Sequence, residues 1–539
     1  MGGGVSIFFA ADGGRRSLHL SLHKPADLSQ NPSGNDHHHG SPLKLPHQLT
    51  HLGALEVQLY RLADEATGGL LLFMVVFGPW AFGTTQPWAV TVMNFTEALL
   101  GGLLVTKLFI RKVKNYPAPR WDSLVLVDEI KRPRSAARTA IKALGWLTFA
   151  LLLFCCLSAL NAAATYSPEK HFFTYHKHQN WLPHSFDSTR SWAYFRLYLG
   201  LAAAFWSARD WLLGRTAAEE RILRHQAEPG VPTMPARLRR LLWVLAVSGT
   251  LLGVEAITQR VADSSKLLFV VQPVVNQAGD TQFGTYAYRS NAAQYFNLLW
   301  PVCLGVWWLL RHKGRRHTYF FAIAAIVMGA CPIISTSRAG AIVAVGMLAV
   351  AGILLVSSEL RTMARHGASR RRWKNLVFTI VFLVGASGLG FYFGWEKLAP
   401  RMDEIGGGYA NREQMYADAR PMAADYPVFG TGPGTFATVF QLYRISNTTY
   451  WPEQLHNDWL ETLITFGWTG LLLAMAALGC VAVLGLFAPR RMALVCGLAL
   501  TGCLVHAYFD FPLQVHSILF LFLLLAAILA ALGTMARKH

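Results

Sequence analysis

Runs of roughly 20 apolar residues recur along the chain, the length that an α-helix needs to cross a hydrocarbon core of about 30 Å. Hydrophobic residues make up 53% of the 539 positions, which fits a membrane protein better than a water-soluble one. Because lipid offers no partner for free backbone groups, each run is predicted to be a helix. We therefore expect an all-α polytopic membrane protein with about 12 transmembrane helices. The runs lie near residues 66–85, 88–110, 141–163, 191–213, 238–258, 291–310, 318–334, 339–356, 375–394, 459–487, 491–510 and 515–534.

The net charge of +19 follows the same alternation. In a soluble protein it would suggest nucleic acid, but here Lys and Arg gather in every second loop, so we expect no nucleic-acid partner. Loops rich in Lys and Arg are cytoplasmic by the positive-inside rule. Both termini are then predicted inside, with 164–190, 259–290 and 395–458 outside. Anionic membrane lipids would also suit the basic clusters, although topology alone accounts for them. The clusters are 111–138, 209–240, 311–316, 361–374, 490–491 and 537–538.

The sequence predicts four regions. Residues 1–65, rich in Gly, Ser, Pro and His, are expected to be a disordered cytoplasmic tail. Residues 66–534 form the transmembrane domain, which contains the outer loop 395–458, and 535–539 form a short cytoplasmic tail. All seven cysteines fall inside apolar runs without metal-type spacing, so we expect core residues and no metal site.

Connections longer than about 12–15 residues are uncommon and are usually functional or disordered. The outer loop 395–458 is far longer than this. Its aromatic residues and glycine turns indicate an ordered segment. The Gly430–Gly434 stretch lacks the Gly-Lys-Ser/Thr ending of a phosphate loop, and no strand precedes it. A tight turn is the expected structure, because Gly and Pro favour turns.

His456 stands at the end of this loop, where the next apolar run begins. Asp458 is expected to be the N-cap of that helix, with Glu461 completing a capping box. This role does not explain His456, which lies just outside the helix. A histidine there is a candidate general base, although spacing alone is equally compatible with a structural role.

Arginines on the predicted outer side suggest an anionic ligand. Arg338 opens an apolar run, where a charge is costly, and its forked donors suit phosphate oxygens. The alternative is an arginine that reaches the lipid headgroups. Arg412, Tyr416 and Arg420 share one face of a predicted helix over about 409–424. An amphipathic helix lying on the membrane explains that face as well.

Three further polar residues lie on the same side. Arg289 and Asn291 stand at the outer start of an apolar run, a weak signal alone. Asp510 follows His506 at the outer end of a late run, where packing or capping is the default role, and it is a candidate partner for an arginine. Several cations with one candidate base suggest a substrate such as a lipid diphosphate.

A transporter would instead need ionisable residues buried within the apolar runs. Glu97 and Glu255 are the main candidates, and their small number argues against this class. A flippase would need a large cationic cavity spanning the membrane rather than a site at one face.

Five motifs resemble the O-antigen ligase and O-antigen polymerase superfamily, and the resemblance covers roughly residues 285–515. The chain departs from the family pattern at Ala339, where glycine is frequent, and in its long N-terminal tail and basic insert at 111–138. The motifs are Ser337-Arg338, Asn411-Arg412, Phe429–Phe436, Leu455–Glu461 and Phe466–Leu472.

This resemblance implies a GT-C-like glycosyltransferase in the bacterial inner membrane. Such enzymes take a glycan from an undecaprenyl-diphosphate carrier on the periplasmic face. Ligases transfer it to the lipid A–core, and polymerases transfer it to another carrier-linked repeat. The resemblance also implies that the enzyme needs neither a metal nor another cofactor, and it does not separate ligase from polymerase.

The roles of Arg338, Arg412 and His456 are likewise implied by the resemblance, whereas those of the other residues follow from their place on the same predicted side. Arg338 and Arg412 are expected to hold the diphosphate, and His456 to deprotonate the acceptor hydroxyl in a direct displacement. Arg289 is expected to assist at the diphosphate. Supporting roles are expected for Asn291, Asn457, Asp458, Asp510 and Tyr416.

Overall fold

The computed structural model describes residues 53–123, 135–225, 234–311, 318–367, 369–403, 405–445 and 451–535. Each predicted apolar run is found as a helix of at least 17 residues. These helices are α1 (Ala54–Trp80), α2 (Pro87–Val113), α3 (Ser135–Leu160), α4 (Ser188–Leu213), α6 (Ala236–Val261), α7 (Arg289–Leu310), α8 (Thr318–Ile334), α9 (Arg338–His366), α10 (Arg370–Asp403), α13 (Asp458–Leu486), α14 (Arg490–His506) and α15 (His516–Thr534).

Among the described residues, eight helices are both long and apolar enough to cross a membrane. The all-α polytopic membrane class is therefore confirmed, whereas twelve spans and a GT-C-like arrangement stay predictions. Helix α1 begins at Ala54, so the last residues expected in the N-terminal tail are helical. Residues 1–52 and 536–539 lie outside the described part of the chain.

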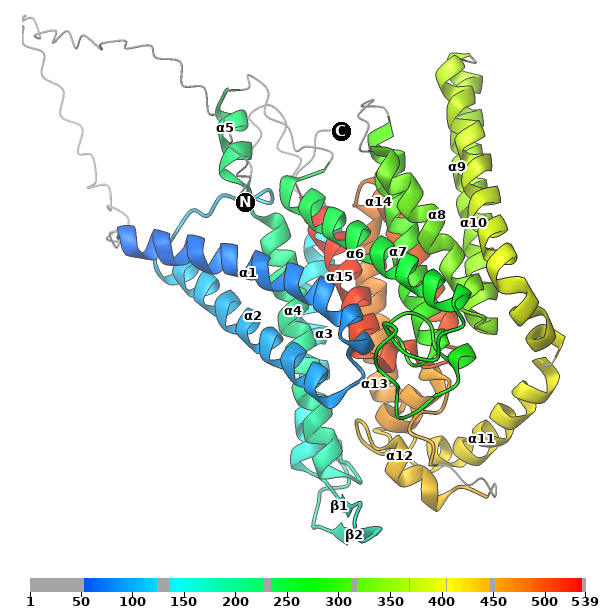
Figure 1. The fold of residues 1–539 in the computed structure, drawn as a ribbon. Coiled ribbons are helices and arrows are strands. Elements are labelled where there is room, and N and C mark those ends of the chain that lie inside the picture. Colours follow the sequence, from blue (N-terminus) through cyan, green and yellow to red (C-terminus); the bar gives the residue numbers. More distant parts are fainter. Residues whose placement is uncertain are drawn as a thin grey trace, which may run out of the picture. The chain divides into compact units, whose positions relative to one another are not determined.

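The remaining elements occupy the connections. Strands β1 (Ala164–Ser167) and β2 (Phe172–Tyr175) form an antiparallel hairpin that pairs Ala164 with Tyr175. Helix α5 (Ala217–His225) follows α4, and α11 (Ile405–Asp425) and α12 (Phe436–Val439) lie in the predicted outer loop. In Figure 1 the hairpin, α11 and α12 lie towards the bottom, and α5 lies towards the top.

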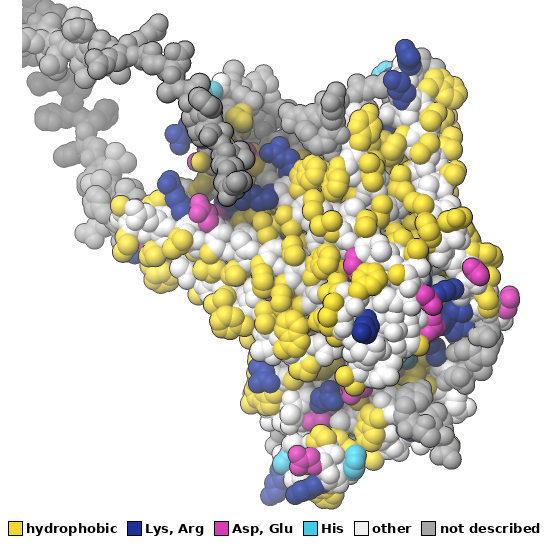
Figure 2. Space-filling model, in the orientation of Figure 1, with side chains coloured by type: hydrophobic (Ala, Val, Ile, Leu, Met, Phe, Trp, Pro, Cys, Tyr) yellow, Lys and Arg dark blue, Asp and Glu magenta, His cyan; other side chains and the backbone are white. Residues whose placement is uncertain are grey.

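Helices α7 and α15 form the centre of the bundle. Nearly every residue of both is buried, and apolar residues surround each helix on all sides, the pattern of a helix enclosed by others. Helices α6, α8, α9 and α14 pack against α7, while α4 and α13 pack against α15. Hydrophobic side chains cover much of the face shown in Figure 2, with Lys and Arg mainly in its upper and lower parts.

An ion-pair cluster joins the first helices, in a region where the sequence indicated only topology. Lys107 is fully buried, and its Nζ lies 3.3 Å from Asp64 Oδ1 and 3.0 Å from Asp210 Oδ2. Two arginines belong to the same cluster: Arg120 lies 2.5 Å from Asp210, and Arg237 lies 2.5 Å from Asp64. Part of the basic stretch 111–138 is therefore a structural element that ties α1, α2, α4 and α6 together.

The glycine-rich turn fills a break in α13. Gly467 adopts φ 60° and ψ −170°, which interrupts the helical hydrogen bonds. The turn replaces them: Trp468 N–H donates to the Pro427 carbonyl (2.8 Å), and Thr431 N–H donates to the Ile464 carbonyl (2.9 Å). Gly430, at φ 69°, permits the close approach of the two backbones, because a Cβ there would overlap the α13 backbone. The predicted tight turn thus also fixes the start of α13.

Replacement of Gly467 by Ala is expected to destabilise the protein. Its conformation is essentially restricted to glycine and costs other residues about 1–3 kcal/mol. In addition, a Cβ would lie 2.5 Å from the Val428 carbonyl carbon, a backbone atom that cannot rotate away. Thermal unfolding in detergent should show a clearly lower Tm for Gly467→Ala. The matched control is Gly479→Ala in the same helix, where a Cβ meets nothing within 4 Å; equal melting of the two variants would contradict this account.

Candidate active site

Asp510, between α14 and α15, is the centre of the candidate site. Its side chain is only 3% exposed and accepts hydrogen bonds from His456 Nδ1 (2.8 Å), the Tyr288 hydroxyl (3.0 Å) and its neighbour's amide, Phe511 N–H (3.1 Å). Arg412 Nη2 lies 3.8 Å from the same carboxylate. The structure therefore brings together three of the candidate residues, from three distant parts of the sequence.

The contact with Asp510 defines the tautomer of His456. A carboxylate only accepts hydrogen bonds, so Nδ1 carries the proton and Nε2 keeps its lone pair. The His456 side chain is 30% exposed, so the imidazole is partly accessible. An imidazole held through Nδ1 by a buried carboxylate is suited to accept a proton from a hydroxyl group at its second nitrogen.

Charge fixes the protonation of the neighbouring groups. Burial alone would raise the pKa of Asp510. The hydrogen bond from His456 and the charge of Arg412 outweigh it and hold the pKa of this carboxyl well below its usual range. Burial and the nearby Asp510 charge raise the pKa of Tyr288, so its hydroxyl stays protonated and remains a donor.

The backbone around His456 is held on both sides. His456 has a positive φ of 59°, uncommon for a residue other than glycine. The Tyr416 hydroxyl of α11 donates to the His456 carbonyl (2.8 Å), and the rings of Phe511 and Tyr288 pack around the imidazole at 4.8 and 6.1 Å between centroids. Tyr416 thus acts on the position of His456 through the backbone.

The expected N-cap at Asp458 is wrong by one residue. Asn457 caps α13, accepting from Leu460 N–H (3.0 Å). The Asp458 carboxylate instead accepts from Leu513 N–H (2.8 Å), while the Glu461 carboxylate accepts from Leu455 N–H (2.8 Å). Asp458 is drawn to the connection between α14 and α15, because that segment packs against the start of α13 and offers an otherwise unpaired amide.

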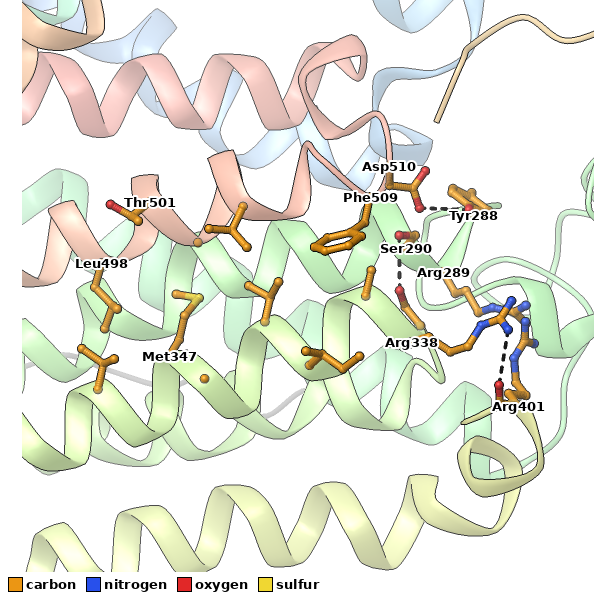
Figure 3. A pocket seen from close by; sticks show the side chains of 18 of the residues that line it. Tyr288, Arg289, Ser290, Arg338, Met347, Arg401, Leu498, Thr501, Phe509 and Asp510 are labelled. Carbon is orange, nitrogen blue, oxygen red and sulfur yellow. Dashed lines mark hydrogen bonds between the residues drawn. The ribbon is translucent and has the colours of Figure 1, made fainter. Parts of the chain in front are cut away.

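Four arginines line one end of a cavity of about 510 Å³ beside this centre. Arg289, Arg338 and Arg412 were candidates from the sequence, and Arg401 is added by the structure. Arg338 Nη1 donates to the Arg401 carbonyl (3.3 Å), and Figure 3 shows these side chains near Asp510 and Tyr288. Arg401 had a sequence signal: it is a basic residue on the side where the positive-inside rule predicts few.

Among the described residues, guanidinium groups at the arginine end of the cavity share their carboxylates. Arg289 and Arg401 share one carboxylate, that of Asp280, at 3.0 and 3.3 Å, and Asp280 is half exposed. Asp510 is shared between Arg412 and His456. Guanidinium groups that share a carboxylate keep donors for a further anion, which suits a ligand with several negative charges.

Neither Asn291, a predicted supporting residue, nor Arg420, a member of the predicted helix face, joins the site. Asn291 is buried in the first turn of α7 and does not line the cavity. Arg420 lies on the exposed side of α11, where it pairs with Glu413 at 2.9 Å. The predicted face of Arg412, Tyr416 and Arg420 therefore includes one residue too many. Only Arg412 and Tyr416 contact the segments next to α14 and α13, at Phe509 and His456 respectively.

His506 contributes a connection that the sequence did not reveal. Its ring nitrogens contact Gln294 Oε1 (2.8 Å) and Ser290 Oγ (3.0 Å), and Ser337 Oγ lies 3.2 Å from Ser290 Oγ. Ser337 is the N-cap of α9, which Arg338 begins. This buried chain of polar groups ties α14 and α7 to the start of α9 and so fixes the position of Arg338.

Among the described residues, no group of three or more His, Cys, Asp or Glu side chains is placed to hold a metal ion. The site therefore consists of one His–Asp pair, one tyrosine hydroxyl and several guanidinium groups around a cavity.

Comparison with known families identifies one matching segment of the chain. Residues 323–475 match the sequence model of the family described as O-Antigen ligase, a segment that contains Arg338, Arg401, Arg412 and His456. This match places the segment 323–475 in the O-antigen ligase superfamily, as the motifs indicated. It is a membrane enzyme of the O-antigen ligase or polymerase type. No curated protein matches the chain.

Replacement of Asp510 by Asn is expected to lower stability at neutral pH by about 1–3 kcal/mol, because buried donors lose their acceptor. Since the folded-state pKa of Asp510 is depressed, its stabilising effect is present above the ordinary aspartate pKa of about 4 and is lost as the pH falls below it. Thermal unfolding of wild type and D510N should therefore differ most near neutrality and converge in acid.

The control for this substitution is Asp263→Asn. Asp263 forms an exposed ion pair with Lys397, and such pairs contribute little. A gap between wild type and D510N that persists unchanged into acid, or an equal effect at Asp263, would contradict the role assigned to the buried carboxylate.

Proposed function

We propose that this protein transfers a glycan from undecaprenyl diphosphate to an acceptor hydroxyl at the periplasmic face of the bacterial inner membrane. In this topology both chain termini lie in the cytoplasm. The observation that carries the proposal is the His456–Asp510 pair beside a cavity end with four arginines. A base for a hydroxyl and a cationic site for a departing diphosphate are the two requirements of this reaction.

The proposed step is a direct displacement. His456 Nε2 takes the proton of the acceptor hydroxyl, whose oxygen attacks the anomeric carbon of the glycan. The bond from that carbon to the diphosphate oxygen breaks, and undecaprenyl diphosphate leaves with the electron pair. Asp510 stabilises the imidazolium that forms. General base catalysis of this kind contributes typically about 10²–10⁴-fold.

The arginines replace a metal ion in this proposal. Arg338 and Arg412 bind the diphosphate oxygens and stabilise the negative charge that grows on the leaving group, with Arg289 and Arg401 completing the cationic surface. Because Arg412 belongs to α11, this helix of the outer loop positions the donor next to His456. Transfer is therefore expected to continue in EDTA.

The acceptor separates two forms of the proposal. A ligase would transfer the glycan to a lipid A–core sugar, and a polymerase would extend another carrier-linked glycan. Product analysis distinguishes them, because a ligase changes the acceptor without lengthening the carrier-bound chain. A transporter or flippase, the remaining class, would bind the lipid donor without transferring its glycan.

The first test is transfer by purified protein in EDTA, with a lipid-diphosphate-linked glycan and candidate acceptors. His456→Ala is expected to lower kcat by at least about 10², the usual range for a lost general base. Arg338→Ala and Arg412→Ala are expected to abolish measurable transfer. Arg420→Ala is the matched control, since it removes an arginine from α11 outside the cavity. Normal transfer by His456→Ala or Arg338→Ala would overturn the assignment.

Binding can be tested separately from transfer. Binding of undecaprenyl diphosphate without a glycan is expected to stabilise the folded protein and so to raise its Tm. At a ligand concentration of 100 times the Kd, the added stability is about 2.7 kcal/mol. Arg401→Ala should reduce this shift, because Arg401 lines the cationic end of the cavity, whereas Arg420→Ala should keep it. An unchanged shift in Arg401→Ala would exclude Arg401 from the diphosphate site.

A further inference from the structure

The β1–β2 hairpin carries a row of aromatic side chains on one face. Tyr166 lies directly opposite Phe173, and Tyr175 is two residues further along the same strand. Because side chains alternate between the two faces of a strand and opposite residues share a face, all three rings project from one side. The ring centroid of Phe173 lies 4.9 Å from that of Tyr166 and 6.4 Å from that of Tyr175. Trp451, from the segment before α13, continues the row at 6.4 Å from Tyr166.

The aromatic surface formed by these four rings lies among polar groups rather than at the membrane surface. Its two most accessible rings, Trp451 and Tyr175, are 42% and 71% exposed. In Figure 1 the hairpin lies at the lower end of the structure, below α11 and α12. Figure 2 shows Lys, Arg, acidic and His side chains gathered at the same end. A belt of aromatic residues at the membrane surface would lie level with the ends of the apolar helices, so it does not account for these rings.

The aromatic surface has a buried base. Tyr166 is only 9% exposed, and its hydroxyl lies 3.1 Å from His171 Nδ1. The His171 ring in turn lies 5.9 Å from the Trp451 ring. Tyr166 and His171 therefore hold Trp451 against the hairpin and leave part of its ring accessible.

The connection between β2 and α4 fixes the hairpin to the candidate site. Phe186 N–H donates to the Thr431 carbonyl (3.0 Å), and the Ser191 hydroxyl donates to the Pro433 carbonyl (2.8 Å). The Phe186 ring also packs against Tyr426 with 4.9 Å between centroids. These partners belong to the glycine-rich turn and the residues before it, which bond the break in α13. The aromatic surface is therefore held in place before any ligand binds, which lowers the cost of binding.

We propose that this aromatic surface binds sugars of the transferred glycan that lie beyond the one attached to the diphosphate. The assignment rests on the proposed function. A pyranose ring presents C–H groups on its faces and hydroxyl groups at its edge, and the negative face of an aromatic ring attracts such C–H groups. Glu453, two residues after Trp451, and its partner Arg190 are about half exposed, so they are placed to accept from and donate to sugar hydroxyls.

The position of Trp451 determines which sugars reach it. Trp451 precedes His456 by five residues, which corresponds to at most about 18 Å of extended chain. Trp451 is not among the residues that line the cavity, so the sugar next to the diphosphate does not touch it. A glycan of several sugars extends from the cavity to the aromatic surface, whereas a single sugar does not. We therefore expect the protein to prefer long glycans.

Binding of lipid-free oligosaccharides tests the aromatic surface without requiring transfer. Oligosaccharides of increasing length, cleaved from the surface polysaccharide of the source organism, are added to the full-length protein in lipid nanodiscs. The Kd is measured by saturation-transfer NMR, and we expect it to fall as repeats are added. Trp451→Ala and Tyr175→Thr should each raise the Kd of the longest oligosaccharide about three- to tenfold, the usual effect of one aromatic contact. An unchanged Kd in both variants would overturn the proposal.

The control is Phe172→Thr, matched to Tyr175→Thr. Both substitutions remove a largely exposed ring from β2 and introduce a residue that favours strands, so neither should prevent folding. Phe172, however, projects from the opposite face of the hairpin, because it is three residues from Tyr175. Phe172→Thr is expected to keep the wild-type Kd. An equal rise in Kd in both variants would contradict a site on one face.

Transfer gives a second measurement that separates this proposal from the proposed function. The advantage of long over single-repeat donors in kcat/KM should fall in Trp451→Ala and Tyr175→Thr and persist in Phe172→Thr. If oligosaccharides bind through these rings and no acceptor receives a glycan, the aromatic surface stands and the transferase proposal fails. If transfer occurs without any dependence on these rings, the transferase stands and the aromatic surface fails. If no oligosaccharide binds, the rings are a surface for a protein partner and the proposal is overturned.

Discussion

The buried carboxylate of Asp510 is the interaction on which the site depends. A carboxylate at 3% exposure is stable only when charges and donors surround it. Here the donors come from the segment before α7, from the end of the loop before α13 and from the connection to α15, and the nearby charge comes from α11. The fold must bring these segments together to satisfy one charge, so the same contact that completes the tertiary structure also orients His456.

Two clusters of charge in the protein differ in exposure. Around Lys107, the carboxylates of Asp64 and Asp210 form short contacts with Lys107, Arg120 and Arg237, and each of these side chains is at most 13% exposed. Around the cavity, Arg289 and Arg401 share the half-exposed carboxylate of Asp280. The first arrangement is typical of a structural cluster, whereas the second is accessible to a ligand.

Much of the fold followed from the sequence, because apolar length and basic loops report directly on helices in a membrane. The sequence also indicated Arg338, Arg412, His456 and Asp510, since polar groups at the ends of apolar runs are costly without a purpose. Its errors concern contacts between distant segments. Asn457 caps α13 because the Asp458 carboxylate accepts from Leu513 N–H instead. The break at Gly467 depends on a turn that precedes it by more than thirty residues. Neither partner is visible in local sequence.

The break in α13, whose backbone groups are bonded by the turn, also has a consequence for the order in which the chain is synthesised. The backbone groups that Gly467 leaves unpaired are bonded by the turn at Pro427–Gly432, which itself receives an amide from Phe186. Both partners precede α13 in the chain, so the ribosome has already made them when it delivers Gly467. The partners of the α13 break are therefore already synthesised when α13 is made, whereas Asp510, which orients His456, follows His456 by 54 residues.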